Sequence, residues 1–219
     1  MQELPVTLMN MLTFTFASLF SMVNPIGMAP VFLEKTKAYP LARRRSLAYK
    51  VGAYGTLLLT TTLLAGPYVL QFFGISLADI QIAGGIFVFY SAWQMLTAPP
   101  GPASDDQANN ERAASDIAFF PLTMPLTAGA GSIAVVLSLS SNIVHSGGNL
   151  AVGYVGAIAG ICLVFVAVAV SYRFADQVFS RIGTVGTGVI TRLTAFLLLA
   201  IGVAVTWGGL RQLLLSLHS

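Results

Sequence analysis

Two long apolar runs in this chain are each interrupted by residues that break helices, and these interruptions restrict the possible folds more than any other feature. The first is Asn24-Pro25-Ile26-Gly27 followed by Pro30, and the second extends from Pro121 to Ser132. In hydrocarbon an unpaired backbone N–H or C=O is very unfavourable, so irregular backbone occurs there only where protein covers it or a polar cavity solvates it. Two such breaks, one in each half of a chain, indicate a binding site.

The composition is that of an integral membrane protein. The 219 residues are 56% hydrophobic and only 9% charged, against about 25% charged residues in soluble domains. The net charge of +3 does not indicate nucleic-acid binding, because we expect the basic residues in loops between spans, where they set orientation. The single Cys162 excludes an internal disulfide.

Six apolar stretches have about the 20 residues that a helix needs to cross a bilayer. They are Thr7 to Leu33, Leu47 to Phe73, Ile75 to Ala98, Ile117 to Asn142, Leu150 to Phe174 and Val189 to Leu215. Between the third and the fourth lies the only polar, low-complexity segment, 99–116, which we interpret as a cytoplasmic linker. We therefore expect an all-α membrane protein with a first three-helix half at 1–98 and a second at 117–219.

The distribution of Lys and Arg predicts the orientation. Ten of the 11 basic residues fall in segments on one side of the predicted membrane, including Lys35 to Lys50, Arg112, and a predicted loop with Arg173, Arg181 and Arg192; Arg211 falls on the other side. The positive-inside rule makes the first side cytoplasmic. We expect a multi-pass protein of the inner (plasma) membrane with both termini outside.

With three spans in each half, the second half must enter the membrane from the opposite side, so any internal repeat is inverted. Each half opens with a broken span, continues with an unbroken one and closes with a span that follows a Gly-containing turn. These turns are Gly74-Ile75-Ser76 and Gly186-Thr187-Gly188. The pattern predicts two inverted three-helix repeats with broken first and fourth helices.

Four spaced motifs together resemble the MarC family of six-span inner-membrane proteins. They are Asn24-Pro25-x-Gly27, Ile82-Ala83-Gly84-Gly85, the run from Pro121 to Gly131, and Arg192-Leu193. The family is grouped with transporters of small neutral amino acids, so the resemblance implies that activity. The chain departs from it at Ala130, where the family commonly has Pro, and at Gln81, where many members have Arg.

The breaks offer groups that can bind a small polar solute. We expect a half-helix to begin after each break, with Pro30 in the first turn of one and Ser132 as N-cap of the other. Helix N-termini bind carboxylates. Amide and hydroxyl side chains bind polar groups of a solute, and the carbonyls of unwound backbone bind ammonium or Na⁺. The candidate residues that bind substrate are Asn24, Pro25, Gly27, Pro30, Pro121, Thr123, Pro125, Thr127, Gly129, Gly131 and Ser132.

One geometric expectation conflicts with inverted symmetry. At 1.5 Å per residue, both breaks fall near the cytoplasmic half, whereas the symmetry would place them on opposite sides of the midplane. Either the fourth element begins earlier than its hydropathy indicates, or one element is re-entrant.

Other patterns limit the chemistry. The sequence has no catalytic constellation and no metal-ligand spacing, so we expect neither an enzyme nor a cofactor, with Na⁺ as a possible coupling ion. Gly156 and Gly160 form a GxxxG that we assign to close packing within one protomer rather than to a dimer face. Trp93, Trp207, Tyr68 and Tyr172 are interpreted as interface anchors or filler.

The sequence therefore predicts a transporter that moves small neutral amino acids or similar solutes by alternating access. A channel or facilitator and a membrane assembly protein are the alternatives. The expected partners are a small solute and the lipid bilayer, and the chain could form a homo-oligomer; nucleic acid is not expected.

Overall fold

A computed structural model describes residues 8–36, 38–97, 118–145 and 149–216, and in these residues the regular elements are all helices, without strands. The elements are α1 (Leu8–Val23), α2 (Pro25–Thr36), α3 (Leu41–Phe73), α4 (Leu77–Thr97), η2 (Ala118–Thr127), α6 (Ala130–His145) and α7 (Leu150–Ser216). η2 is a π-helix. The predicted linker at 99–116 lies outside the described residues.

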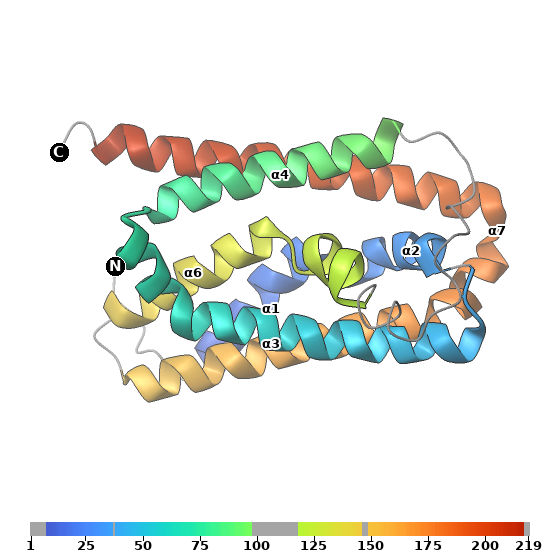
Figure 1. Ribbon diagram of the computed structural model, residues 1–219, viewed down its shortest axis with the longest axis horizontal. Coiled ribbons are helices and arrows are strands. Elements are labelled where there is room, and N and C mark those ends of the chain that lie inside the picture. Colours follow the sequence, from blue (N-terminus) through green and yellow to red (C-terminus); the bar gives the residue numbers. More distant parts are fainter. Residues whose placement is uncertain (1–7, 37, 98–117, 146–148, 217–219) are drawn as a thin grey trace.

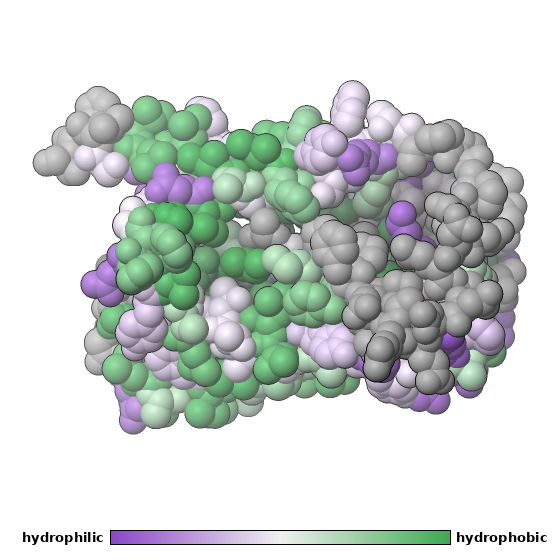
Figure 2. All heavy atoms as spheres, viewed as in Figure 1, coloured by the Kyte–Doolittle hydropathy of each residue, from purple (hydrophilic) through white to green (hydrophobic). Residues whose placement is uncertain are grey.

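The helices run side by side along one long axis (Figure 1). Hydrophobic atoms cover most of the visible flank, and strongly hydrophilic atoms gather toward the two ends (Figure 2). Among the described residues, four helical segments are long and apolar enough to cross a membrane: Leu8–Leu33, Leu41–Phe73, Leu150–Phe179 and Gly186–Ser216. The third and fourth predicted spans correspond to α4 and to η2 with α6, which are outside this set, so a total of six spans stays a prediction.

Helices extend beyond their apolar parts at the basic end of the molecule. α3 begins at Leu41, six residues before the predicted start at Leu47. The predicted loop with Arg173, Arg181 and Arg192 was wrong, because all three lie within α7. A helix needs no apolar side chains where it leaves the membrane, so hydropathy alone places its end too early.

Two glycines with positive φ end the long helices. Gly74 (φ 66°) ends α3, where its N–H donates to Gln71 O and the Ile75 N–H donates to Leu70 O at 3.0 Å. Gly183 (φ 78°, ψ 175°) divides the 67 residues of α7 into two straight parts. Only glycine adopts such angles at low cost. The turn predicted at Gly186 to Gly188 therefore lies three residues earlier, at Gly183, and the later glycines are helical.

Small residues bring the helices close together. Gly156 and Gly160 both face α1, where an added Cβ would lie 2.9 Å from Leu8 O and 2.9 Å from Leu12 O, respectively. The assignment of this GxxxG to packing within one protomer is confirmed. The second part of α7 packs on α4 in the same way, through Gly85 and Gly202. α4 and this part of α7 form one layer of the molecule (Figure 1).

Candidate solute site at the two helix breaks

The two breaks lie at the same level, near the middle of the long axis (Figure 1). α1 has 16 residues before its break and α6 has 16 after its own. α2 and η2, on the other side of the breaks, have 12 and 10. α1 contacts α6 and α2 contacts η2, so the matched lengths align the breaks. α2 and α6 lead away from this level in opposite directions.

This arrangement resolves the conflict over depth. α2 continues to Thr36, past the predicted end at Leu33, and η2 begins at Ala118. The first break therefore lies nearer the middle of its element than counting from the apolar boundaries indicates, and the second lies after Thr127, ten residues into the described part of its element. A central position for both breaks is compatible with inverted symmetry.

Asn24 caps α2. Its φ of 45° is the only positive φ at a non-glycine residue in the described part of the chain, and Asn is among the few residues that tolerate that region. The side-chain oxygen Oδ1 accepts a hydrogen bond from the Gly27 N–H at 3.2 Å. Pro25 follows in the first helical position, where its missing N–H is not needed.

Gly27 is required by the folded-back amide of Asn24. A Cβ on Gly27 would lie 2.5 Å from Asn24 Nδ2 and 2.9 Å from Oδ1, closer than atoms can approach. The Asn-Pro-x-Gly motif is thus explained as a helix start: a cap, a first-turn proline and space for the capping side chain.

The expected role of Pro30 was wrong. The half-helix begins at Pro25, and Pro30 lies buried inside α2. Since proline has no N–H, the carbonyl of Ile26 lacks its usual partner within the helix. Pro30 therefore weakens α2 one turn beyond the break rather than starting it.

The second break is preceded by the π-helix η2. Pro121 and Pro125 lie within it and cannot donate to the usual carbonyl four residues earlier. Hydroxyls and N–H groups instead reach five residues back. Thr123 donates to Ala118 O at 2.6 Å, Thr127 donates to Leu122 O at 2.7 Å, and the Ala128 N–H donates to Thr123 O at 2.7 Å.

α6 starts directly after the break, with Gly129 in the cap position. The Gly129 carbonyl accepts from the Ile133 N–H at 3.1 Å and from the Ser132 hydroxyl at 2.8 Å. Ser132 was therefore wrongly predicted as the N-cap, because it lies in the first turn and bonds backwards. Ala130 is the first helical residue. Proline is favoured at this position, which explains why proline is common there in the family.

Gly131 brings the two breaks into contact. A Cβ added to this buried glycine would collide with Met22 Cε on α1 and would lie 3.3 Å from Val88 Cγ2 on α4. Met22 lies two residues before Asn24, so the start of α6 packs against the end of α1. Three elements meet at one glycine.

Tyr172 completes this region, and the sequence reasoning missed it. Its hydroxyl lies 2.9 Å from the Thr127 hydroxyl, and its ring stacks on Phe32 of α2 at 4.4 Å. Only 2% of Tyr172 is exposed, so it is neither an interface anchor nor apolar filler, whereas Trp93, Trp207 and Tyr68 are exposed. The available signal was a hydroxyl inside an apolar span.

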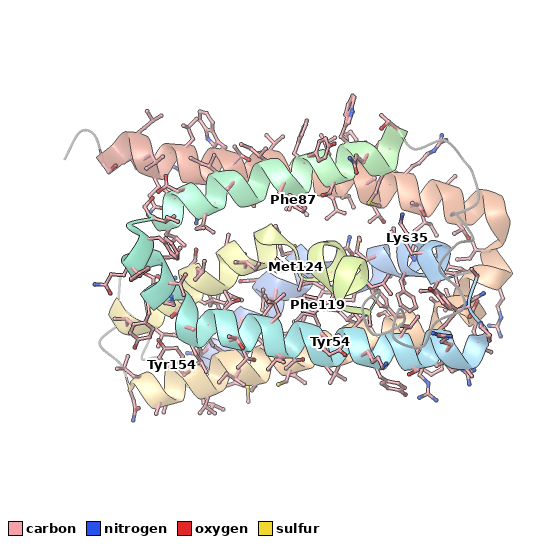
Figure 3. All side chains as sticks on the ribbon, in the orientation of Figure 1. Lys35, Tyr54, Phe87, Phe119, Met124 and Tyr154 are labelled. Carbon is pink, nitrogen blue, oxygen red and sulfur yellow. The ribbon has the colours of Figure 1, made fainter. Side chains whose placement is uncertain are left out.

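α3 covers η2 from the side. The rings of Tyr54 on α3 and Phe119 on η2 meet edge to face, with their centroids 6.0 Å apart (Figure 3). The residues Thr123, Thr127 and Ser132 are each at most 2% exposed. The break region is thus closed in this conformation, with its hydroxyls hydrogen-bonded to the protein.

The chemistry available at the breaks is that of two helix N-termini inside a largely apolar surrounding. Each N-terminus carries about half an elementary positive charge, and N–H groups of a first turn bind anions. No group of three or more His, Cys, Asp or Glu that could hold a metal occurs in the described residues. The arrangement suits a small ligand with one anionic group.

The fold and these breaks define an all-helical integral membrane protein in which two interrupted helices meet midway along the molecule. The family model described as MarC family integral membrane protein matches residues 9–214. The chain therefore belongs to the MarC family, as its motifs indicated.

Relatives extend over almost the same length. The chain is 34% identical to the UPF0056 membrane protein YvbG of Bacillus subtilis, over 90% of this chain and 92% of that protein. It is 33% identical to a UPF0056 membrane protein of Aquifex aeolicus, over 91% of this chain and 92% of that protein. It is 30% identical to the UPF0056 inner membrane protein MarC of Citrobacter koseri, over 91% of this chain and 94% of that protein. None of these names states an enzyme activity or a transported solute. No solved structure matches.

Proposed function

We propose that this protein is a secondary transporter that moves small neutral amino acids, or similar small polar solutes, by alternating access. The observation that supports this most is the meeting of two helix starts, α2 and α6, at one level in the middle of the molecule. Discontinuous helices with inward N-termini are a recurrent way of holding the carboxylate of a solute at the bilayer midplane. We place the protein in the inner membrane. The Citrobacter koseri relative is named as an inner membrane protein, and this supports the same location here.

The proposed architecture has six spans in two inverted halves. It is supported by the matched lengths of the helices around the breaks. It is also supported by Gly74 and Gly183, which have positive φ and each separate the second from the third span of one half. In this architecture α1 with α2 is equivalent to η2 with α6. The halves rock against each other around the breaks.

The solute would enter when this closed region opens. Its carboxylate would meet the first-turn N–H groups of α6, and its ammonium group would meet carbonyls near Asn24 or in η2. The aligned breaks suit a solute of a few heavy atoms. Coupling by Na⁺ bound to these carbonyls and export driven by the solute gradient are both compatible with the proposal, and no other cofactor is required.

Purified protein in liposomes tests the proposal. Labelled glycine or alanine should exchange against unlabelled amino acid inside the vesicles, and the uptake should saturate. Unsaturable flux without counterflow would indicate a channel, and no flux in either assay would favour an assembly protein. Ala130→Pro should retain transport, because proline fits the first position of α6.

Calorimetry with an acid and its amide tests the carboxylate separately. Glycine should bind and glycinamide should not, since charge-assisted hydrogen bonds contribute roughly 1.5 to 3 kcal/mol each. Equal affinity would remove the carboxylate from the model and favour a neutral hydroxylated solute.

A further inference from the structure

A second site lies at the basic end of the molecule, away from the breaks. An open pocket of about 460 Å³ lies between the start of α3 and residues 173–177 of α7. Its lining includes the three arginines Arg44, Arg45 and Arg173 and one carboxylate, Asp176. Pockets of this size hold small ligands, and this one is rich in positive charge.

The single carboxylate is already neutralised. Arg44 Nη1 lies 2.6 Å from Asp176 Oδ1, and Arg44 Nε donates to the Tyr39 carbonyl at 2.8 Å. This ion pair joins α3 to α7 and fixes one wall of the pocket. Arg45 and Arg173 therefore give the pocket its net positive charge.

Arg45 adds a second guanidinium to the pocket lining, with one donor that no group in the described part of the chain satisfies. Its Nε is buried and has no hydrogen-bond partner in the described structure. A buried donor on a charged group is costly to leave unsatisfied. Because this atom has almost no accessible surface, an acceptor in the pocket would satisfy it only after the Arg45 side chain turns toward the pocket.

Arg173 and the start of α3 add donors to the same space. The Arg173 guanidinium lies over the rings of Tyr49 and Phe174, with its central carbon 5.5 and 5.7 Å from their centroids. These cation–π contacts do not use the N–H groups of the guanidinium as hydrogen-bond donors, so the N–H groups can still donate. α3 begins beside the pocket without a side-chain cap, because Pro40 occupies the cap position, and helix N-termini attract anions.

We propose that this pocket binds a phosphate group, carried either by an anionic phospholipid headgroup or by a soluble phosphate. Planar guanidinium groups match phosphate oxygens in pairs, and the pocket offers two of them from different helices. It lies at the polar end of the candidate spans Leu41–Phe73 and Leu150–Phe179, where headgroups lie. Basic pockets between helices bind anionic headgroups at such positions. This inference does not rest on the transport proposal.

Binding to the purified full-length protein in non-ionic detergent tests the site. The probes are short-chain phosphatidylglycerol, short-chain phosphatidylcholine and inorganic phosphate, and the measurement is the dissociation constant. We expect a phosphate-bearing anion to bind at least about tenfold more tightly than phosphatidylcholine, a difference of about 1.4 kcal/mol, and the binding to weaken with salt. Binding of phosphatidylglycerol that inorganic phosphate does not displace identifies the lipid as the source. Binding and displacement by inorganic phosphate identify a soluble phosphate.

Two double variants with the same change of charge locate the site. Arg45→Gln with Arg173→Gln should weaken binding at least about tenfold. Arg181→Gln with Arg192→Gln, two exposed positions on α7 outside the pocket lining, should leave it unchanged. Thermal unfolding without ligand checks that each variant is folded.

If the first variant is unfolded, Arg45→Lys with Arg173→Lys replaces it. This variant should also bind more weakly than the wild type, because an ammonium group lacks the fork geometry. Equal binding of all probes by the wild type would overturn the proposal. An equal loss of affinity in the two glutamine variants would also overturn it. The same holds if the pocket variant that is folded binds as tightly as the wild type.

Discussion

At the scale of single residues, the first break is a helix start in which each residue has a separate task. Asn24 accepts the positive φ and caps α2, Pro25 opens the helix, and Gly27 leaves space for the capping amide. These tasks are local, which is why the sequence alone located the break. They also mean that Asn24 contributes to stability whether or not it contacts a solute.

Substitutions at Asn24 separate these two contributions. Asn24→Leu should lower the free energy of unfolding by about 0.5 to 2 kcal/mol for the lost cap and by about 1 to 2 kcal/mol more for the left-handed backbone. Asn24→Gly should lower it by only a few tenths, because glycine accepts both the cap position and the φ. Reversible unfolding in mixed micelles measures both.

The glycine variant also tests the solute contact. If it keeps its stability but loses counterflow activity, the Asn24 side chain contacts the solute. A leucine variant as stable as the glycine variant would contradict the capping role.

The hydroxyl pair of Thr127 and Tyr172 predicts a measurable coupling. A double-mutant cycle with Thr127→Val and Tyr172→Phe should give an interaction free energy of about 0.5 to 1.5 kcal/mol, since the pair is buried and 2.9 Å apart. Ser140 and Tyr154, a second hydroxyl pair that joins α6 and α7 at 3.3 Å, provide the control cycle and should couple less. A coupling near zero for the first pair would show that its hydrogen bond does not hold η2 to α7.

At the scale of elements, close packing of α4 on the second part of α7 depends on glycine. A Cβ on Gly202 would lie 2.6 Å from the Phe89 nitrogen and 2.8 Å from the Gly85 carbonyl oxygen. Membrane helices associate largely through such close backbone approach. The pair therefore has little tolerance for added volume.

Gly202→Leu should destabilise the protein by about 1 to 3 kcal/mol, because it overpacks this contact. The matched control is Gly208→Leu on the same helix, where an added Cβ meets nothing within 4 Å and the change should stay within about 0.5 kcal/mol. Thermal unfolding in detergent gives both values. The idea fails if the two variants lose equal stability.

The sequence predicted elements well and contacts between elements poorly. The breaks at Asn24 and near Gly129 followed from proline, glycine and asparagine chemistry, which acts within one turn of backbone. The Thr127–Tyr172 pair and the Arg44–Asp176 ion pair join residues 45 and 132 positions apart, and spacing carries no signal for them. The wrong role for Pro30 arose because Pro25 and Pro30 both offered a first helical position, and the wrong role for Ser132 arose because serine fits both the cap and the first turn.

At the scale of the whole molecule, the Lys and Arg distribution predicts an orientation in the membrane with both termini outside. A reporter that is active only in the cytoplasm should be silent when fused after Ser219 and active when inserted between residues 102 and 110. Reporter activity in cells measures this, and a reporter active only in the periplasm should give the complementary pattern. The reversed result would overturn the orientation and would put the basic end of the molecule, with its pocket, outside.

Gly183 leaves the two long parts of α7 joined by one non-helical residue. The first part carries the contacts with α1, and the second carries those with α4. Their relative position is therefore set by two torsion angles, in a region of backbone space that no side chain can share at low cost. A swing of the α4 layer relative to α1 would need a change of backbone angles at this residue, since no loop separates the two parts of α7.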